Sequence, residues 1–409
     1  MSFDLIIENA RLVDRLEPVD IGVRADRIER IAPRLDEDGP RERADGRLAF
    51  GGFVETHIHL DKAGILDRCT ICEGTLAEAV RETARAKAAF TEEDVYARAA
   101  TVLEQAILHG TMKLRSFVEI DPRAGFRSFD ALLQLKQDYA FAIDLEICAF
   151  AQEGLTNEPE TLPMLESALQ HGADLVGGCP YTDPDPGEHI RLIFDLGARY
   201  DVPVDFHIDF DLNAAGSNLP RVISESLARG YEGRVSVGHA TKLSAMAPGE
   251  VDHLARQLAE AGISVTVLPS TDLFLMGRGS DRLVPRGLAP ASSLHRQGVN
   301  ISVASNNILN PFTPYGDASL GRMANLYANV AQLALDADLR AAFAAVSSDA
   351  ARLLGTPYGL VEGGVADIVL IDAPDPATAV RTIAPVLAGW KRGRKTFSRP
   401  RAALLRPAP

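Results

Sequence analysis

The sequence predicts a (β/α)8 TIM barrel with a small β-sandwich domain built from both chain ends, and three observations carry this prediction. Eight short, nearly continuous apolar runs recur along the middle of the chain, as expected of strands buried on both faces. Amphipathic helical segments separate most of these runs, which is the alternation of a parallel barrel. At both ends of the chain, apolar and polar residues alternate instead with the period of half-buried strands.

The eight predicted barrel strands are residues 49–59, 112–120, 142–150, 173–180, 202–210, 234–240, 262–270 and 299–307. Residues 91–109 carry one apolar stripe at helical spacing, and Thr91 with Asp94 three residues later predicts the start of that helix. Similar patterns predict helices over residues 187–200, 218–229, 249–261 and 317–335. A doubly wound open sheet is the structural alternative, but no Gly-x-Gly-x-x-Gly follows the first run.

The two chain ends carry the remaining strand patterns. Residues 4–13 and 20–31 read as two short antiparallel strands, and residues 359–372 and 384–397 repeat that style. The simplest interpretation is that both ends pair into one domain, formed by residues 1–50 and 356–409, around a barrel of residues 51–355. The alternative interpretation is two unrelated β appendages.

Composition excludes several classes of protein. The 409 residues are 46% hydrophobic and 24% charged, which is ordinary for a globular protein and unlike disordered, collagen-like or disulfide-scaffold chains. A net charge of −14 disfavours nucleic acid or an anionic membrane as a partner. The chain has no apolar run of 18 residues and no basic leader at its start, so we expect a cytoplasmic protein without a membrane span.

Histidines mark the ends of three predicted strands. His57 and His59 follow one another at the spacing that points both side chains to one face of the first strand, which is a chelating arrangement for a divalent metal. His207 and His239 end the fifth and sixth strands. Because barrel strands end at a common mouth, we expect these imidazoles to meet there. The other five are interpreted as solvated bystanders: His109, His171, His189, His253 and His295.

Six stretches then resemble the amidohydrolase superfamily, and within it the cytosine deaminases and the N-isopropylammelide isopropylamidohydrolases. They are GGFVETHIHLDK (51–62), AFAQEGL (149–155), ADLVGGCP (173–180), VDFHID (204–209), VGHA (237–240) and ASNNILNPFTPYG (304–316). The resemblance implies hydrolysis of a C–N bond in a small nitrogen heterocycle, one divalent metal ion and a homo-oligomer. Zinc is the first expectation for the metal, and three histidines also suit iron, manganese or nickel.

The resemblance also implies roles for individual residues. His57, His59 and His207 would hold the metal, and His239 would polarise or protonate the substrate at the attacked carbon. The substrate-binding residues would be Gln152, which hydrogen-bonds the heterocycle, Phe312, which lies over the ring, and Asn307. A capping amide and a packed loop aromatic are the plainer interpretations of Gln152 and Phe312.

The chain departs from these relatives at the site itself. Asn306 stands where the family has an aspartate that binds the metal and moves the proton, and Asn cannot accept a proton near neutral pH. Phe210 replaces the glutamate of cytosine deaminases, which disfavours cytosine as substrate. Glu119 ends the second strand, in Phe-Val-Glu where the relatives show His-Val-Asp. The candidate substitute proton acceptors are Asp61, Asp209, Asp272 and His239.

Three explanations of Asn306 compete: an engineered Asp→Asn variant, a natural enzyme with another proton acceptor, and a silent homologue that binds a heterocycle. Asn307 and Asn310 also stand where cytosine deaminases have aspartates. Three such changes together favour natural divergence. The expected function is therefore metal-dependent hydrolysis of a heterocycle other than cytosine, and the alternative is a catalytically impaired protein that only binds its ligand.

Overall fold

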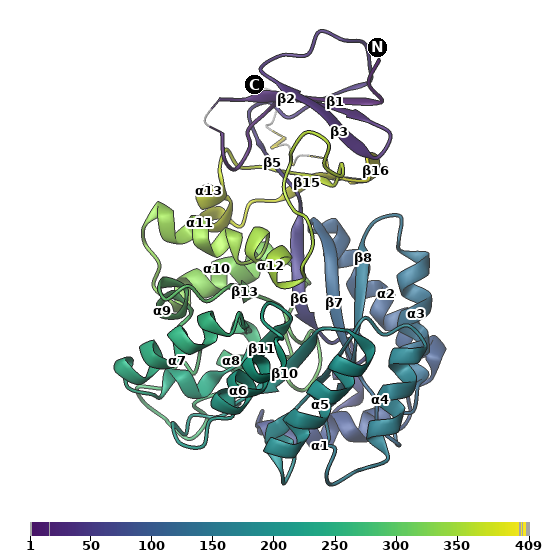
Figure 1. The fold of residues 1–409 in the computed structure, drawn as a ribbon. Coiled ribbons are helices and arrows are strands. Elements are labelled where there is room, and N and C mark those ends of the chain that lie inside the picture. Colours follow the sequence, from purple (N-terminus) through teal and green to yellow (C-terminus); the bar gives the residue numbers. More distant parts are fainter. Residues whose placement is uncertain (1, 16, 401, 403, 406–409) are drawn as a thin grey trace.

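The computed structural model describes residues 2–15, 17–400, 402, 404 and 405. Its largest sheet has eight parallel strands that neighbour one another in chain order (Figure 1). A parallel bridge between Ile58 and Asn306 joins the first strand to the segment after the last, so the sheet closes into the predicted barrel. Every strand overlaps one of the eight predicted runs: β6 (Phe53–Ile58), β7 (Thr111–Glu119), β8 (Asp144–Ala151), β9 (Leu175–Gly178), β10 (Val204–Ile208), β11 (Val235–His239), β12 (Ser264–Val267) and β13 (Ile301–Val303).

Helices surround this barrel. Thr91 caps the second of them by accepting a hydrogen bond from the Asp94 amide, as the sequence predicted, and that helix buries its apolar stripe. Among the described helices, none has both the length and the apolar character needed to cross a bilayer. They are α1 (Leu76–Lys87), α2 (Glu92–Leu108), α3 (Arg127–Asp138), α4 (Thr161–Gln170), α5 (Pro186–Tyr200), α6 (Leu219–Arg229), α7 (Pro248–Glu260), α8 (Pro269–Leu275), α9 (Ala291–Arg296), α10 (Leu320–Val330), α11 (Asp336–Ala344) and α12 (Ser348–Leu353), with short 3-10 turns η1 (Leu66–Arg68), η2 (Pro180–Thr182) and η3 (Thr241–Ser244).

The chain ends form two four-stranded sheets above the barrel (Figure 1). One contains β1 (Leu5–Ala10), β2 (Val19–Arg24), β3 (Arg27–Ala32) and β4 (Arg41–Arg43), and the other β5 (Leu48–Phe50), β14 (Ile368–Ile371), β15 (Val386–Lys391) and β16 (Arg394–Ser398). Because β5 pairs antiparallel with β14, the two ends belong to one domain and the appendage interpretation is wrong.

Two details differ from the sequence prediction for these ends. Residues 20–31 are not one strand: the run divides into β2 and β3 at a turn where Ala25 has φ of +52°. A further helix, α13 (Pro376–Thr382), lies against α10, where Asn325 donates to the Val380 carbonyl at 2.9 Å. The domain boundaries after residue 50 and before residue 356 stay a prediction, and residues 401, 403 and 406–409 of that range lie outside the described chain.

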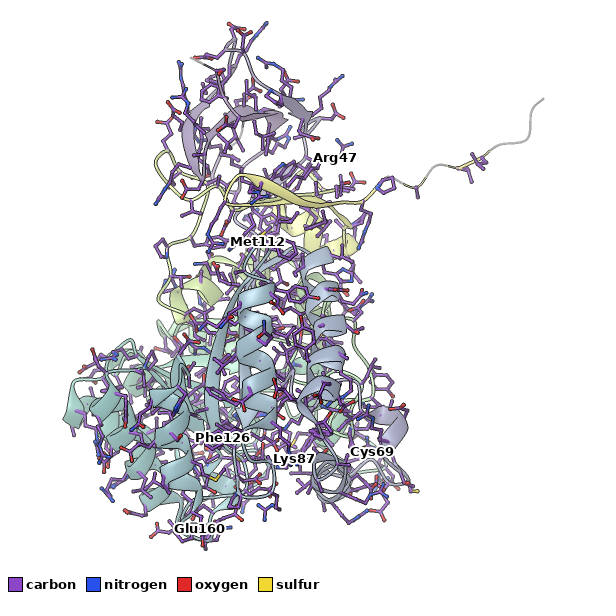
Figure 2. The ribbon with its side chains drawn as sticks, turned by 90° about the vertical axis from the view of Figure 1, so that its right-hand side faces the viewer. Arg47, Cys69, Lys87, Met112, Phe126 and Glu160 are labelled. Atoms are coloured by element: carbon purple, nitrogen blue, oxygen red, sulfur yellow. The ribbon has the colours of Figure 1, made fainter. Side chains whose placement is uncertain are left out.

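The small domain covers the end of the barrel where the strands begin. Figure 2 shows Met112, at the start of β7, next to the small domain, and Lys87 and Cys69 at the opposite end. A buried ammonium fastens this junction, because Lys391 Nζ donates to the Met112 carbonyl at 3.1 Å and pairs with Asp144 and Asp367 at 2.7 Å each. The carboxyl ends of the strands therefore remain free of the small domain, and the candidate site lies there.

Replacing Lys391 by Met is expected to lower the free energy of unfolding by about 3 kcal/mol, because it leaves the Asp367 carboxylate and the Met112 carbonyl without their buried cation. Denaturant unfolding measures the change. The matched control is Lys395→Met on β16, whose exposed pair with Glu42 is worth less than about 1 kcal/mol. Equal stability losses in the two variants would contradict this account of the junction.

Candidate metal centre and active site

Three histidines converge at the mouth of the barrel. His57 comes from β6, His59 from the residue that follows it, and His207 from β10. The His207 Nε2 atom lies 2.8 Å from His57 Nε2 and 3.0 Å from His59 Nε2. All three side chains are buried. The structure thus brings together the three residues predicted to hold a metal.

The chemistry of this group fits a divalent cation. Burial, and after it neighbouring positive groups such as Lys62, lower the pKa of all three imidazoles well below its ordinary value, so the rings are neutral. A neutral imidazole has one acceptor nitrogen, and here three Nε2 atoms point at one place. Three neutral nitrogen ligands with room for a further ligand are the donor set of a catalytic zinc site.

Packing rather than hydrogen bonding holds these rings in place. Their Nδ1 atoms are buried without a hydrogen-bond partner among the described residues. The ring of Phe117 lies 4.2 Å from His57, and the ring of Phe150 lies 4.2 Å from His207, measured between centroids. The Phe-Val-Glu departure at the end of the second strand therefore places an aromatic ring against the three converging imidazoles.

His239 lies beside the three imidazoles, with its ring centroid 5.5 Å from that of His207. Its Nδ1 donates to Asp272 Oδ1 at 2.7 Å, and its Nε2 lies 3.4 Å from Asn306 Nδ2. Because Nδ1 keeps its proton and donates it in the hydrogen bond to Asp272, Nε2 is the acceptor nitrogen and the Asn306 amide donates to it. That orientation leaves Asn306 Oδ1 buried and without a partner in the described part of the chain.

The backbone is unusual at the same two positions. His239 has φ of +68° and Asn306 has φ of +60°, which is the left-handed region that side-chain-bearing residues avoid. Such conformations persist where the surrounding structure over-determines them, and they gather at functional sites. Here the surrounding structure is the barrel seam, where the Asn306 amide donates to the His57 carbonyl at 2.8 Å and the His59 amide donates to the Asn306 carbonyl at 2.9 Å.

The predicted substrate-binding residues lie at this same end of the barrel. Gln152 follows β8, and its amide donates to Cys179 Sγ at 3.4 Å. Asn307 Oδ1 accepts from Asn310 Nδ2 at 2.7 Å. The ring of Phe312 is buried among apolar side chains that include Phe210.

The candidate proton acceptors separate clearly in the structure. Asp209 accepts from Ser217 Oγ at 2.5 Å and from the Asn218 amide at 3.0 Å, so it orders its own loop. Asp61 accepts from the amides of Lys62 and Glu119. Asp272 alone of the three aspartates contacts His239, and burial raises its pKa although His239 opposes the shift.

A buried group of charges beside the mouth was not predicted from the sequence. Lys87 Nζ lies 2.7 Å from Glu119, 2.8 Å from Asp121 and 3.3 Å from Glu153. These three carboxylates have metal-like spacing, but the Lys87 ammonium already supplies their cation. Burial raises the pKa of the Glu119 carboxyl, yet Lys62 and Lys87 outweigh it and bring that pKa to about 2. The only feature of the sequence that pointed to this buried group was Glu119, which stands where the relatives have an aspartate.

One histidine prediction is wrong. His189 is not solvated: its ring is fully buried at the start of α5, with Nδ1 at 3.0 Å from Asp183 Oδ2. Asp183 in turn accepts from the amides of Leu155 and Thr156, which ties the loops after β8 and β9 together. A Cβ at Gly178 would collide with this imidazole, so the glycine at the end of β9 was the available signal. His171, His253 and His295 are exposed, and His109 is half-buried.

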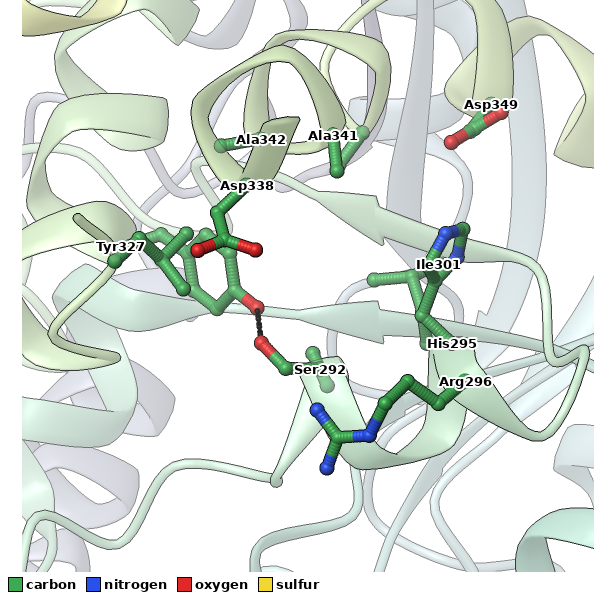
Figure 3. A pocket seen from close by; sticks show the side chains of 12 residues that line it. Ser292, His295, Arg296, Ile301, Tyr327, Asp338, Ala341, Ala342 and Asp349 are labelled. Atoms are coloured by element: carbon green, nitrogen blue, oxygen red, sulfur yellow. Dashed lines mark hydrogen bonds between the residues drawn. The ribbon is translucent and has the colours of Figure 1, made fainter. Parts of the chain in front are cut away.

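A separate pocket of about 140 Å³ opens on the outside of the barrel between α9, α10 and α11 (Figure 3). Its lining includes Ser292 and Tyr327, whose hydroxyl oxygens lie 3.3 Å apart, together with His295, Arg296 and Asp338. None of the four histidines at the mouth lines it. This pocket is therefore distinct from the candidate metal centre.

Comparisons with known proteins agree with this geometry. A family model described as "Amidohydrolase family" matches residues 145–397. N-isopropylammelide isopropyl amidohydrolase of Pseudomonas sp. (strain ADP) is 30% identical, over 96% of this chain and 97% of that protein. Pterin deaminase of Rhizobium rhizogenes is 27% identical, over 88% and 83%. The crystal structure of 5-methylcytosine deaminase from Klebsiella pneumoniae, liganded with 5-fluorocytosine, superposes with a TM-score of 0.94 at 29% identity, over 98% and 99%.

Replacing His57 or His207 by Ala is expected to lower metal affinity roughly 100-fold or more, because each change removes one of three converging nitrogens. Elemental analysis after dialysis against a chelator measures the retained metal. His171→Ala, on the exposed end of α4, is the matched control and should retain as much metal as the unmodified protein. Full metal content in both site variants would refute the proposed ligand set.

Proposed function

Because the chain belongs to the amidohydrolase family, we propose that it hydrolyses an exocyclic C–N bond of a small nitrogen heterocycle, with one divalent metal ion held by His57, His59 and His207. The observation that carries the proposal is the convergence of three buried, neutral imidazole Nε2 atoms next to His239 and Asp272. The named activities of the relatives support the substrate class, since they act on ammelide, pterin and cytosine rings.

Zinc is the metal we propose, because it favours neutral imidazole nitrogens and an open coordination position. When bound, a divalent cation of this kind lowers the pKa of water toward neutrality and polarises the attacked C–N carbon. Asn306 Oδ1, buried and without a protein partner in the described structure, is suited to serve as a neutral oxygen ligand. Asn306 then orients the site without taking part in proton transfer.

The proton acceptor we propose is His239, with Asp272 behind it. Asp272 fixes the tautomer in which Nδ1 carries the proton, so that Nε2, whose only hydrogen-bond contact among the described residues is the long one of 3.4 Å to Asn306 Nδ2, is the basic nitrogen. His239 takes the proton of the attacking water as the new C–O bond forms. It then returns that proton to the amine nitrogen as the C–N bond breaks, and the ring keeps the oxygen. This pair replaces the aspartate that the chain lacks at position 306.

The ring would lie between Gln152, Asn307 and Phe312. Asn307 has its carbonyl oxygen engaged by Asn310, which leaves its amide nitrogen without an acceptor among the described residues and available to the substrate. Phe210, whose ring centroid lies 4.1 Å from that of His239, gives the site an apolar wall where cytosine deaminases have a glutamate. A ring that needs protonation by that glutamate, such as cytosine, is therefore disfavoured.

We further propose a cytoplasmic, homo-oligomeric enzyme. Its four cysteines, Cys69, Cys72, Cys148 and Cys179, are free thiols, as proteins of reducing compartments usually have. Oligomerisation rests on the family resemblance, and light scattering after size exclusion tests it directly.

Asp272→Asn is expected to lower kcat of the zinc-loaded enzyme by roughly 10²–10⁴-fold, because it removes the group that orients and charges the base. Amine or ammonia release from a panel of pyrimidines, pterins and triazines measures this, with metal content determined on the same samples. Asp209→Asn is the matched control, since that carboxylate is engaged by Ser217 and Asn218. It should lose less than about tenfold.

Asn306→Asp separates the enzyme from a silent binding protein. In the proposed mechanism the unmodified protein turns over at least one ring of the panel, and the Asp variant remains active. If neither protein hydrolyses any ring while both bind one tightly, the protein is a silent homologue and the proposed function is wrong.

A further inference from the structure

Lys62 places a buried positive charge at the mouth of the barrel. Its side chain is 3% exposed, and its Nζ donates to Glu119 Oε1 at 2.5 Å. An ammonium group has three N–H donors, and Glu119 is the only hydrogen-bond acceptor that the described residues give it. Leaving buried donors without an acceptor is costly, so a group that accepts from them is the missing part of this arrangement.

The position of this ammonium is built by the loop after the last barrel strand. Asn310 Nδ2 donates to the Lys62 carbonyl at 3.2 Å, while Asn310 Oδ1 accepts from the amides of Phe312 and Thr313. The same asparagine thus orders both the lysine and the aromatic residue. As a result, Lys62 Nζ lies over the Phe312 ring at 4.6 Å from its centroid.

Lys62 shares its carboxylate partner with a second ammonium group. The Glu119 carboxylate pairs with both Lys62 and Lys87. Lys87 has two further carboxylate partners, Asp121 and Glu153. Lys87 is the last residue of α1, and the partners of its Nζ among the described residues are the three carboxylates of Glu119, Asp121 and Glu153. Lys62 is the member of this chain of charges that lies against a predicted substrate-binding ring.

We propose that Lys62 is a specificity-determining residue whose free N–H donors bind an exocyclic oxygen of the substrate ring. This inference rests on the proposed function and narrows its substrate class to oxo-substituted heterocycles. A planar ring beside Phe312 brings its edge within reach of the ammonium that already lies over that phenyl face. An oxo or oxyanion group there accepts a hydrogen bond from the Lys62 ammonium. An amino group at the same place directs its own N–H donors at the ammonium, and the N–H groups of Lys62 then remain without an acceptor.

Paired substrates that release the same amine test this selection. N-isopropylammelide carries two ring oxygens, and N-isopropylmelamine carries two amino groups in their place, so both release isopropylamine. For each zinc-loaded protein, the quantity compared is the ratio of kcat/KM between the members of the pair, which does not depend on the fraction of protein that is folded.

The unmodified enzyme is expected to prefer the oxo ring by roughly 10- to 100-fold, the range of a charge-assisted hydrogen bond. Lys62→Met should lower kcat/KM for that ring by a similar factor and bring the preference close to one, and Lys62→Arg should restore part of it. Lys87→Met is the matched control, because it removes the other ammonium from the same Glu119 carboxylate. It should keep the preference, whatever it costs in stability.

Two results overturn the inference while leaving the proposed function intact: an unchanged preference in Lys62→Met, or an equal loss of preference in Lys87→Met. If no protein hydrolyses any ring, the proposed function fails. The affinity for cyanurate, measured by calorimetry, then tests separately whether Lys62 binds a ring oxygen. Binding that weakens at least tenfold in Lys62→Met and not in Lys87→Met supports the inference, and equal binding by all three proteins rejects it.

Discussion

Two backbone hydrogen bonds across the barrel seam hold the candidate site together. They join His57, on the first strand, and His59, just after it, to Asn306, which follows the last strand about 250 residues later in the chain. Without this closure, the two imidazoles of the first strand would face an open edge, and His207 would approach them from one side only. The seam also forces Asn306 into a left-handed conformation, which turns its amide toward His239. The closure of the sheet is therefore also the assembly of the site.

Burial is what gives the assembled groups their chemistry. Removed from water, the three imidazoles are neutral and present nitrogen lone pairs, as a metal ligand must. The same burial makes each charged side chain near the mouth depend on a partner of opposite charge. The Glu119 carboxylate lies between the ammonium groups of Lys62 and Lys87 and pairs with both. Since the small domain covers the opposite end of the barrel, this low-dielectric mouth is shaped by the loops after the strands alone.

The parts of this arrangement that could be predicted from the sequence are those with a local signal. Apolar runs of the right length located all eight strands, and histidines at strand ends located the three imidazoles that converge at the mouth. The Asp272–His239 contact had no such signal, although each residue was a separate candidate proton acceptor, because it joins residues 33 positions apart through the barrel geometry. Lys62 stood within a recognised motif, but its pairing with Glu119 spans 57 positions. His189 was misjudged because a histidine in a polar helix start gives no sign that Asp183 buries it.

The asparagine at position 306 is best understood together with its neighbours. An aspartate there would place a second carboxylate close to Asp272, with His239 between them, and two buried carboxylates around one imidazole would compete for its protons. With an amide at 306, the protons are ordered in one direction: Asn306 donates to His239 Nε2, and His239 Nδ1 donates to Asp272. The carboxylate next to His239 is therefore that of Asp272, on the Nδ1 side of the ring, and no carboxylate stands on the Nε2 side at position 306. In the proposed mechanism the base is therefore His239 backed by Asp272 instead of a carboxylate at position 306, and the three neighbouring asparagines, 306, 307 and 310, form a neutral rim beside the Lys62 ammonium.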